Sequence, residues 1–211
     1  MKSDYNTVRG EGKILYEDRK SKFISRAVPV SKEAEAILYI NKIRELHRDA
    51  THNVYAYSVY DGVLQQRFSD DGEPGGTSGK PTLEAITRLG VMNVVVVTTR
   101  YFGGTLLGAA GLMRAYGRSA QMAIEEAKIV RMVYRENIHI VCEYAYMGKL
   151  QNLVSKLGYG VAKLSYAVDV EMVIRVPEDK VDEFIKKVVD ETNDRVLWEK
   201  AGGEFVVEEA T

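Results

Sequence analysis

Apolar and polar positions alternate over several short stretches before residue 70, a pattern typical of half-buried β-strands. The alternation predicts four strands, which are, in chain order, Gly12–Asp18, Lys22–Val30, Asn53–Tyr60 and Val63–Phe68. Asp61-Gly62 between the last two is a strong hairpin signal, because both residues tolerate a positive φ. The first third of the chain therefore predicts an antiparallel sheet.

Apolar positions three or four residues apart predict two helices in the same region. The first is expected to follow Ser31 as its N-cap and to end near His47, with an apolar stripe made of Ile37, Leu38, Ile40, Ile43 and Leu46. Ser69–Gly79 is predicted to be a loop. The second helix has Pro81 in its first turn and Gly90 at its C′ position.

Asn93–Thr99 is a continuous β-branched run and predicts a buried central strand. A long helix over Thr105–Glu126 is expected to follow Gly103-Gly104. Its predicted apolar stripe consists of Leu106, Ala110, Met113, Ala120 and Ile124. A second face of small residues, which we expect to pack against the protein's own sheet, consists of Gly108, Gly111, Ala115 and Ser119.

The remainder predicts the order β-α-β-β-α-β, which is that of the ferredoxin-like unit. The expected segments are Lys128–Tyr144, Gly148–Leu157, Tyr159–Ala167, Asp169–Val176, Pro177–Asp190 and Arg195–Val207. The only cysteine, Cys142, falls on the same strand face as Ile138 and Ile140, so we expect it to be buried.

Charge and length favour a division into two domains, residues 1–127 and 128–211. The first carries 17 Lys and Arg against 15 Asp and Glu, a net of +2; the second carries 12 against 15, a net of −3. Residues 85–124 include four arginines and no acid. No apolar run is long enough to span a membrane, and the polar start of the chain argues against export, so we expect a cytoplasmic protein. The sequence leaves the oligomeric state open, with a monomer slightly favoured.

Two glycine-rich turns that precede helices are candidate anion sites. At Gly75-Gly76 a nucleotide-binding P-loop is excluded, because Pro74 and Pro81 occupy two essential positions, but free N–H groups beside Lys80 could still hold an anion. The other interpretation is a tight turn with a solvated Lys80. The second turn, Arg100 with Gly103-Gly104, either binds phosphate or carboxylate or pairs Arg100 with nearby acids.

Asp70, Asp71 and Glu73 are acids on one loop, but their spacing matches no calcium loop, and no zinc pattern exists, so we expect no metal or cofactor. His52 is either a general base or a hydrogen-bonded structural residue, and no catalytic set is assigned. Arg114 and Arg118, four residues apart, share one helix face that could be a docking surface.

These stretches resemble the IMPACT family, in its bacterial YigZ and YvyE type. The resemblance is carried by residues 69–81 (SDDGEPGGTSGKP), residues 94–104, Gly108, residues 111–112 and 114–116, and by the shorter motifs at residues 20–23 and 50–57. It implies an α+β chain with a ribosomal protein S5 domain 2-like domain followed by a ferredoxin-like domain. Together these resemble domains IV and V of elongation factor G.

The resemblance also implies a link to translation, since eukaryotic members are translational regulators. We therefore expect a protein that binds RNA, the ribosome or a translation-associated protein through the Arg- and Gly-rich face of its first domain. The alternative is an enzyme for a small phosphate- or carboxylate-bearing substrate. Its pocket would be formed by His52, Asp70, Asp71, Glu73, Lys80 and Arg100.

Overall fold

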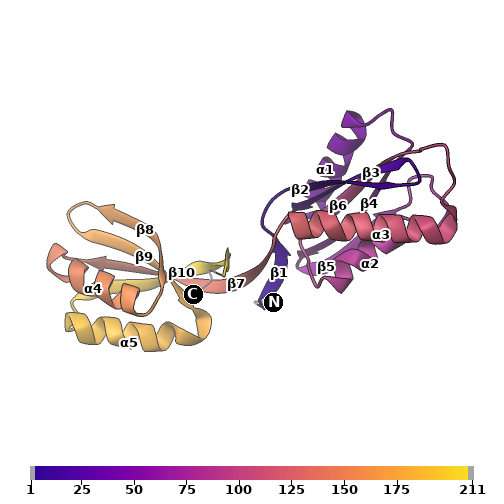
Figure 1. Ribbon diagram of the computed structural model, residues 1–211. Helices are drawn as coiled ribbons and strands as arrows, with labels where there is room; N and C mark the ends of the chain where they lie inside the picture. The colour runs from indigo at the N-terminus through magenta and orange to yellow at the C-terminus, as the bar shows by residue number, and fades with distance from the viewer. Residues whose placement is uncertain (1–2, 209–211) are drawn as a thin grey trace. The chain divides into compact units, whose positions relative to one another are not determined.

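The computed structural model describes residues 3–208, and the chain divides into two compact units (Figure 1). One unit is Tyr5–Arg131, and the other comprises residues 3–4 and 132–208. Residues 1–2 and 209–211, at the outer ends of the two expected domains, lie outside the described residues. Each unit has its own sheet and its own hydrophobic core, so the α+β fold class is confirmed.

The first unit is built on a five-stranded antiparallel sheet with the order β2-β3-β6-β4-β5. The strands are β2 (Gly12–Asp18), β3 (Ser21–Pro29), β6 (Val94–Tyr101), β4 (His52–Asp61) and β5 (Val63–Ser69). The predicted hairpin is confirmed, with Gly62 at φ +78°. The predicted central strand is also confirmed, because β6 lies in the middle and Val94 to Val97 have no exposed surface.

A short strand, β1 (Tyr5–Val8), was missed from the sequence. Its four residues are too few for alternation to be read, and its partners lie far along the chain: Asn6 forms a parallel bridge to Val91, and the strand pairs with the strand that begins at Ile129.

Three helices cover the two faces of this sheet (Figure 1). α1 (Glu33–Leu46) packs on one face, while α2 (Gly79–Arg88) and α3 (Gly108–Glu126) lie on the other. The alternation of β6 serves both cores: Val95 and Val97 pack with α1, and Val94 and Val96 pack with α2 and α3. The resulting three-layer unit is the S5 domain 2-like fold that the resemblance implies.

The expected apolar stripe of α1 is wrong in part. Ile40 and Ile43 are buried, but Ile37, Leu38 and Leu46 are exposed, because the buried stripe follows the spacing of Ala36, Ile40 and Ile43 and the other three lie off it. The expected N-cap is also wrong. The cap position belongs to Lys32, and the backbone N–H and hydroxyl of Ser31 instead donate to the carboxylate of Glu35.

The start and the buried face of α3 also differ from the prediction. The helix begins at Gly108, not at Thr105, and Leu106, Ala110 and Met113 are exposed. On the small-residue face, Ala115 and Ser119 are fully buried, but Gly108 is exposed and Gly111 is half-buried, so the expected close packing is confirmed only for the later half of that face. The buried face of α3 combines small and large side chains, because Leu112, Tyr116 and Ile124 are buried beside Ala115 and Ser119.

The second unit has the strand order β10-β7-β9-β8, as a ferredoxin-like fold requires. Its elements are β7 (Ile129–Cys142), α4 (Tyr144–Lys156), β8 (Gly160–Tyr166), β9 (Val170–Pro177), the short 3-10 helix η1 (Glu178–Lys180), α5 (Val181–Thr192) and β10 (Val196–Val207). The helices cover one sheet face over a core that includes Ile138, Ile140 and Cys142. The burial predicted for Cys142 is confirmed at 3% exposure.

Candidate functional site

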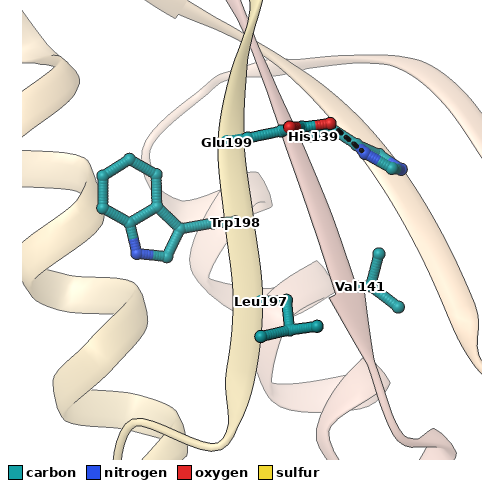
Figure 2. Close-up of a pocket in the computed structure, with 5 residues that line it drawn as sticks. All are labelled: His139, Val141, Leu197, Trp198 and Glu199. Carbon is teal, nitrogen blue, oxygen red and sulfur yellow. Dashed lines mark hydrogen bonds and ion pairs between the residues drawn. The ribbon is translucent and has the colours of Figure 1, made fainter.

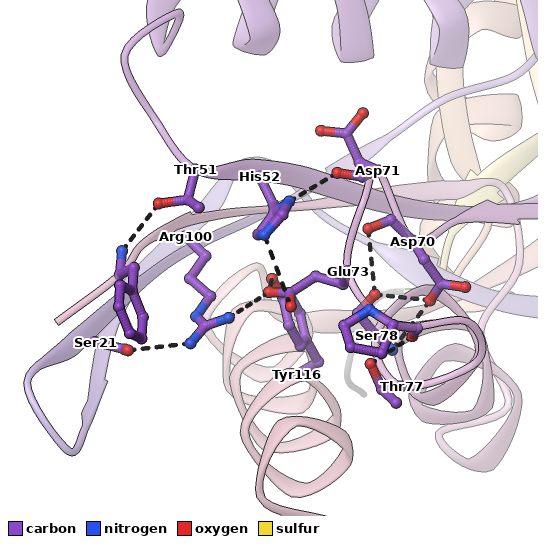
Figure 3. Close-up of polar contacts among 12 residues, drawn as sticks. Ser21, Thr51, His52, Asp70, Asp71, Glu73, Thr77, Ser78, Arg100 and Tyr116 are labelled. Carbon is purple, nitrogen blue, oxygen red and sulfur yellow. Dashed lines mark hydrogen bonds and ion pairs between the residues drawn. The ribbon is translucent and has the colours of Figure 1, made fainter. Parts of the chain in front are cut away.

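The beginning of α2 is capped by the carboxylate of Asp70 (Figure 3). Oδ1 accepts hydrogen bonds from the N–H groups of Ser78 and Gly79 and from the Ser78 hydroxyl, at 3.1, 2.8 and 2.7 Å. Oδ2 accepts from the N–H of Gly76 at 2.8 Å. Burial alone would raise the pKa of Asp70, but these bonds outweigh it and hold the pKa below its usual range. These backbone N–H groups, which the sequence made candidates for binding an external anion, therefore donate to the carboxylate of Asp70 instead.

Asp71, at φ +47°, connects the loop between β5 and α2 to α1 and β4. Its carboxylate accepts from Arg44 Nη2 at 2.8 Å and from the N–H of Asn53 at 2.7 Å. Its carbonyl oxygen lies 2.8 Å from His52 Nδ1. Since a carbonyl only accepts, Nδ1 carries the hydrogen, and Nε2 of the same ring faces Glu73 Oε2 at 3.8 Å.

Glu73 is the centre of a buried polar cluster that we call the Glu73 cluster: His52, Glu73, Arg100 and Tyr116 (Figure 3). Oε1 of Glu73 accepts from Arg100 Nη1 at 2.6 Å and from the Tyr116 hydroxyl at 2.7 Å. The side chains of Glu73 and Arg100 are only 3% and 6% exposed. Burial, and then the charge of Glu73, raises the pKa of Tyr116, so its hydroxyl remains a donor.

The Glu73 cluster holds two surface loops together through Arg100. Nη2 of Arg100 donates to Ser21 Oγ at 3.3 Å, and the same oxygen accepts from the N–H of Gly103 at 3.2 Å. The Arg100 guanidinium lies 5.5 Å from the ring of Phe102. A Cβ on Gly103 would lie 2.0 Å from the carbonyl carbon of Lys20, so only glycine permits this approach. The turn between β2 and β3 is thereby fixed against the loop that precedes α3.

Four exposed cations lie around these two loops and the start of α3: Arg19, Lys20, Arg114 and Arg118, which we call the basic rim. Arg19 Nη1 donates to the carbonyl of Leu106 at 3.1 Å, and Arg114 Nη2 lies 3.7 Å from Asp18 Oδ2. Arg118 follows one turn along α3. The sequence singled out Arg114 and Arg118 as one helix face but included Lys20 only in the family motif at residues 20–23, since no local signal places that segment beside Gly103.

The structure thus separates the expected site residues into groups. His52, Asp71, Glu73 and Arg100 are brought together, and Asp70 binds the loop containing Gly75 and Gly76. Lys80 is exposed and lies 4.0 Å from Glu84 on α2, away from this cluster. Gly103 packs on the β2–β3 turn, whereas Gly104 adopts φ +79° in open space. Within residues 3–208, no group of three or more His, Cys, Asp or Glu is arranged to hold a metal ion.

A separate hollow lies on the sheet of the second unit, on β7 and β10 (Figure 2). It has a volume of about 250 Å³ and is lined by His139, Val141, Leu197, Trp198 and Glu199. His139 Nδ1 lies 3.4 Å from Glu199 Oε1, and its Nε2 lies 3.7 Å from Glu171 Oε2. The histidine therefore bridges two carboxylates of neighbouring strands, a pairing that the sheet register explains.

Together the fold and the loop network define a two-domain α+β protein with a glycine-rich surface on its first domain. The chain belongs to the IMPACT family. The Impact N-terminal domain matches residues 19–124, and a domain of unknown function, DUF1949, matches residues 140–195. No helix of the described residues is long and apolar enough to cross a membrane.

Two bacterial relatives and a solved structure cover most of the chain, whereas a eukaryotic relative covers less than half of it. IMPACT family member YvyE of Bacillus subtilis is 36% identical over 92% of this chain and 89% of its own length. YigZ of Escherichia coli is 32% identical over 84% and 88%. A crystal structure of a hypothetical protein aligns with a TM-score of 0.62 at 28% identity, covering 94% of this chain and 97% of that one. Protein IMPACT of Xenopus laevis is 37% identical over 43% of this chain and 30% of its own length.

Proposed function

We propose that this protein is a cytoplasmic translation-related factor that binds structured RNA, including ribosomal RNA, through the basic rim. The observation that carries the proposal is the arrangement of four exposed cations. Arg19 and Lys20 lie on the β2–β3 turn, which the Glu73 cluster fixes against the loop before α3, and Arg114 and Arg118 lie on α3 itself. Phosphate groups are bound by such Lys and Arg clusters, and a fixed framework reduces the entropy lost on binding. The implied link of the family to translation gives the proposal its biological setting.

The surroundings of the basic rim suit a nucleic acid better than a small anion. Residues 85–124 contain no acid, and the nearest carboxylate, Asp18, has a side chain that is only 18% exposed. Phe102 and Leu106 are 45% and 79% exposed beside the cations. An exposed ring can stack on an unpaired base, which is the common mode of recognition in single-stranded RNA loops.

The test is nitrocellulose filter binding with a structured ribosomal RNA fragment across a salt series. Alanine at all four positions of the basic rim should weaken binding at least about tenfold. It should also flatten the plot of log affinity against log salt concentration, because each lost phosphate contact reduces the slope of that plot by roughly 0.7–0.9. The matched control replaces four exposed cations elsewhere, Lys42, Arg48, Lys163 and Lys186, with the same change in net charge. Equal losses in both variants would remove the basic rim as the binding surface.

The enzymatic alternative receives less support. Four of its six residues converge, but Glu73 is nearly inaccessible and already shares one oxygen between Arg100 and Tyr116. A substrate would have to displace that ion pair, and Lys80 lies away from it. The arrangement favours a structural role for the Glu73 cluster, with His52 as a hydrogen-bonded histidine.

A further inference from the structure

Two adjacent aromatic residues at the end of β6 have different surroundings. The hydroxyl of Tyr101 donates to Asp49 Oδ1 at 3.1 Å and lies 2.9 Å from His47 Nδ1, so this ring is held within the first unit. The ring of Phe102 has no polar atom and is 45% exposed. Single exposed apolar side chains are common on proteins, so exposure alone does not mark a site, and the surroundings of Phe102 decide its role.

One side of the Phe102 ring is covered by a buried cation. The guanidinium carbon of Arg100 lies over this ring at 5.5 Å from its centroid, and the Arg100 side chain is only 6% exposed. A cation in this position is attracted to the electron-rich face of the ring. The exposed part of the ring is therefore the side that points away from Arg100.

The backbone at Phe102 is fixed on both sides. Its own N–H donates to Thr51 Oγ1 at 3.0 Å, and the N–H of Gly103 donates to Ser21 Oγ at 3.2 Å. Gly103 also packs closely against the backbone of Lys20. Because the ring is already held by its neighbours, a ligand that covers it has little conformational entropy to remove.

The charges near Phe102 indicate what would cover the ring. Lys20 lies on the turn that Gly103 contacts, and Arg19 of the same turn donates to the carbonyl of Leu106. A ring beside such cations suits a nucleotide, whose base stacks on the ring while its phosphates bind the cations. An apolar protein segment would cover the ring but leave the cations without partners. Bases inside a duplex are stacked on one another, so only an unpaired base can reach the ring.

From these observations we propose that Phe102 is a stacking platform for one unpaired RNA base. Loops, bulges and single-stranded ends, rather than uniform duplex, are then the substrate class of the basic rim. This inference rests on the proposed function. Arg100 positions the ring from its buried side, and the phosphates that flank the stacked base bind the basic rim.

The test uses an RNA hairpin that carries 2-aminopurine, a fluorescent adenine analogue, in its loop. Stacking on Phe102 should lower the fluorescence of this base when saturating protein is added, whereas the same analogue placed in the stem should not respond. Phe102→Leu should abolish the response and weaken binding about tenfold, or about 1.4 kcal/mol, which is the scale of one stacked base. The slope of log affinity against log salt concentration should remain, because no phosphate contact is lost.

Two further variants control for the ring and for general surface changes. Phe102→Trp keeps an aromatic ring and should retain both the fluorescence response and the affinity. Phe68→Leu replaces a phenylalanine that is also 45% exposed, on β5 at the opposite edge of the sheet from β2, and should change neither.

The possible outcomes distinguish the stacking platform from RNA binding itself. The platform is overturned if Phe102→Leu behaves like wild type, if Phe102→Trp loses the response, or if a fully paired duplex binds as tightly as the hairpin. In each of these cases RNA binding by the basic rim can still be measured in the salt series. If the wild-type protein binds neither RNA, the platform and the proposed function are both wrong.

Discussion

Arg100 Nη1 and Glu73 Oε1 lie 2.6 Å apart, and both side chains are almost entirely removed from solvent. The two residues are 27 positions apart in the chain, at the end of β6 and in the loop before α2. Burying two charges is costly unless they are compensated. Here Tyr116 and Ser21 provide further hydrogen bonds, while the buried Nε of Arg100 has no hydrogen-bond partner. The pair therefore fixes the glycine-rich loops to the sheet.

Removing one partner of this pair should be more damaging than removing both. We expect Glu73→Leu to cost about 3–5 kcal/mol, because it leaves the Arg100 charge buried without a counter-ion. The double variant Glu73→Leu with Arg100→Met should recover part of that loss, since no buried charge remains. Urea unfolding of the single and double variants measures the coupling; losses that simply add would mean that the pair contributes little.

Asp70 should stabilise the protein in a pH-dependent way. Its pKa is lower in the folded state than in the unfolded chain, so its contribution is present above the unfolded value and is lost as pH falls through the folded value. Asp70→Asn places an amide against N–H donors and should cost about 1–3 kcal/mol at neutral pH. The difference between variant and wild type, followed by thermal melting, should shrink at acidic pH. A constant difference would contradict a role of the charge.

Substitution by alanine should affect stability strongly at one glycine of the candidate site and hardly at all at another. At Gly103 a Cβ meets the backbone of Lys20, so Gly103→Ala should destabilise the protein by more than about 2 kcal/mol and weaken RNA binding by displacing the β2–β3 turn. Gly75 has open space and no positive φ, so Gly75→Ala should change stability by less than about 0.5 kcal/mol. Equal melting temperatures for the two variants would show that the close approach at Gly103 is absent.

The thiol of Cys142 should be inert in the native protein. Burial raises its pKa, with a smaller effect from the charge of Asp169, and its side chain lies in the core of the second unit. Labelling by a maleimide at neutral pH should therefore be slow and should accelerate in urea at the same concentration that unfolds this unit. Rapid labelling without denaturant would contradict the packing of β7 against the helices.

Local patterns were sufficient to predict most strands and helices, the hairpin at Gly62 and the ferredoxin-like order of the second unit. These features depend on alternation, helical periodicity and turn chemistry, which act over a few neighbouring residues. These local patterns did not identify the buried face of α3. Leu112, Tyr116, Ala120 and Ile124 are buried at four-residue spacing, whereas Met113 of the expected stripe is exposed. Apolar residues occur on more than one face of this helix, and packing against α2 and the sheet selects between them.

The sequence by itself determined the elements, the family motifs and the set of charged residues near the glycine-rich turns. Only the tertiary structure decided which of those charges face one another: Asp70 occupies the N–H groups of α2, Glu73 neutralises Arg100, and Arg19 and Lys20 join Arg114 at the surface. The physical reason is that hydrogen bonds and ion pairs act over a few ångströms in space. Their partners here are separated by up to 87 positions in the chain, and only packing of the sheet and helices brings them within that range.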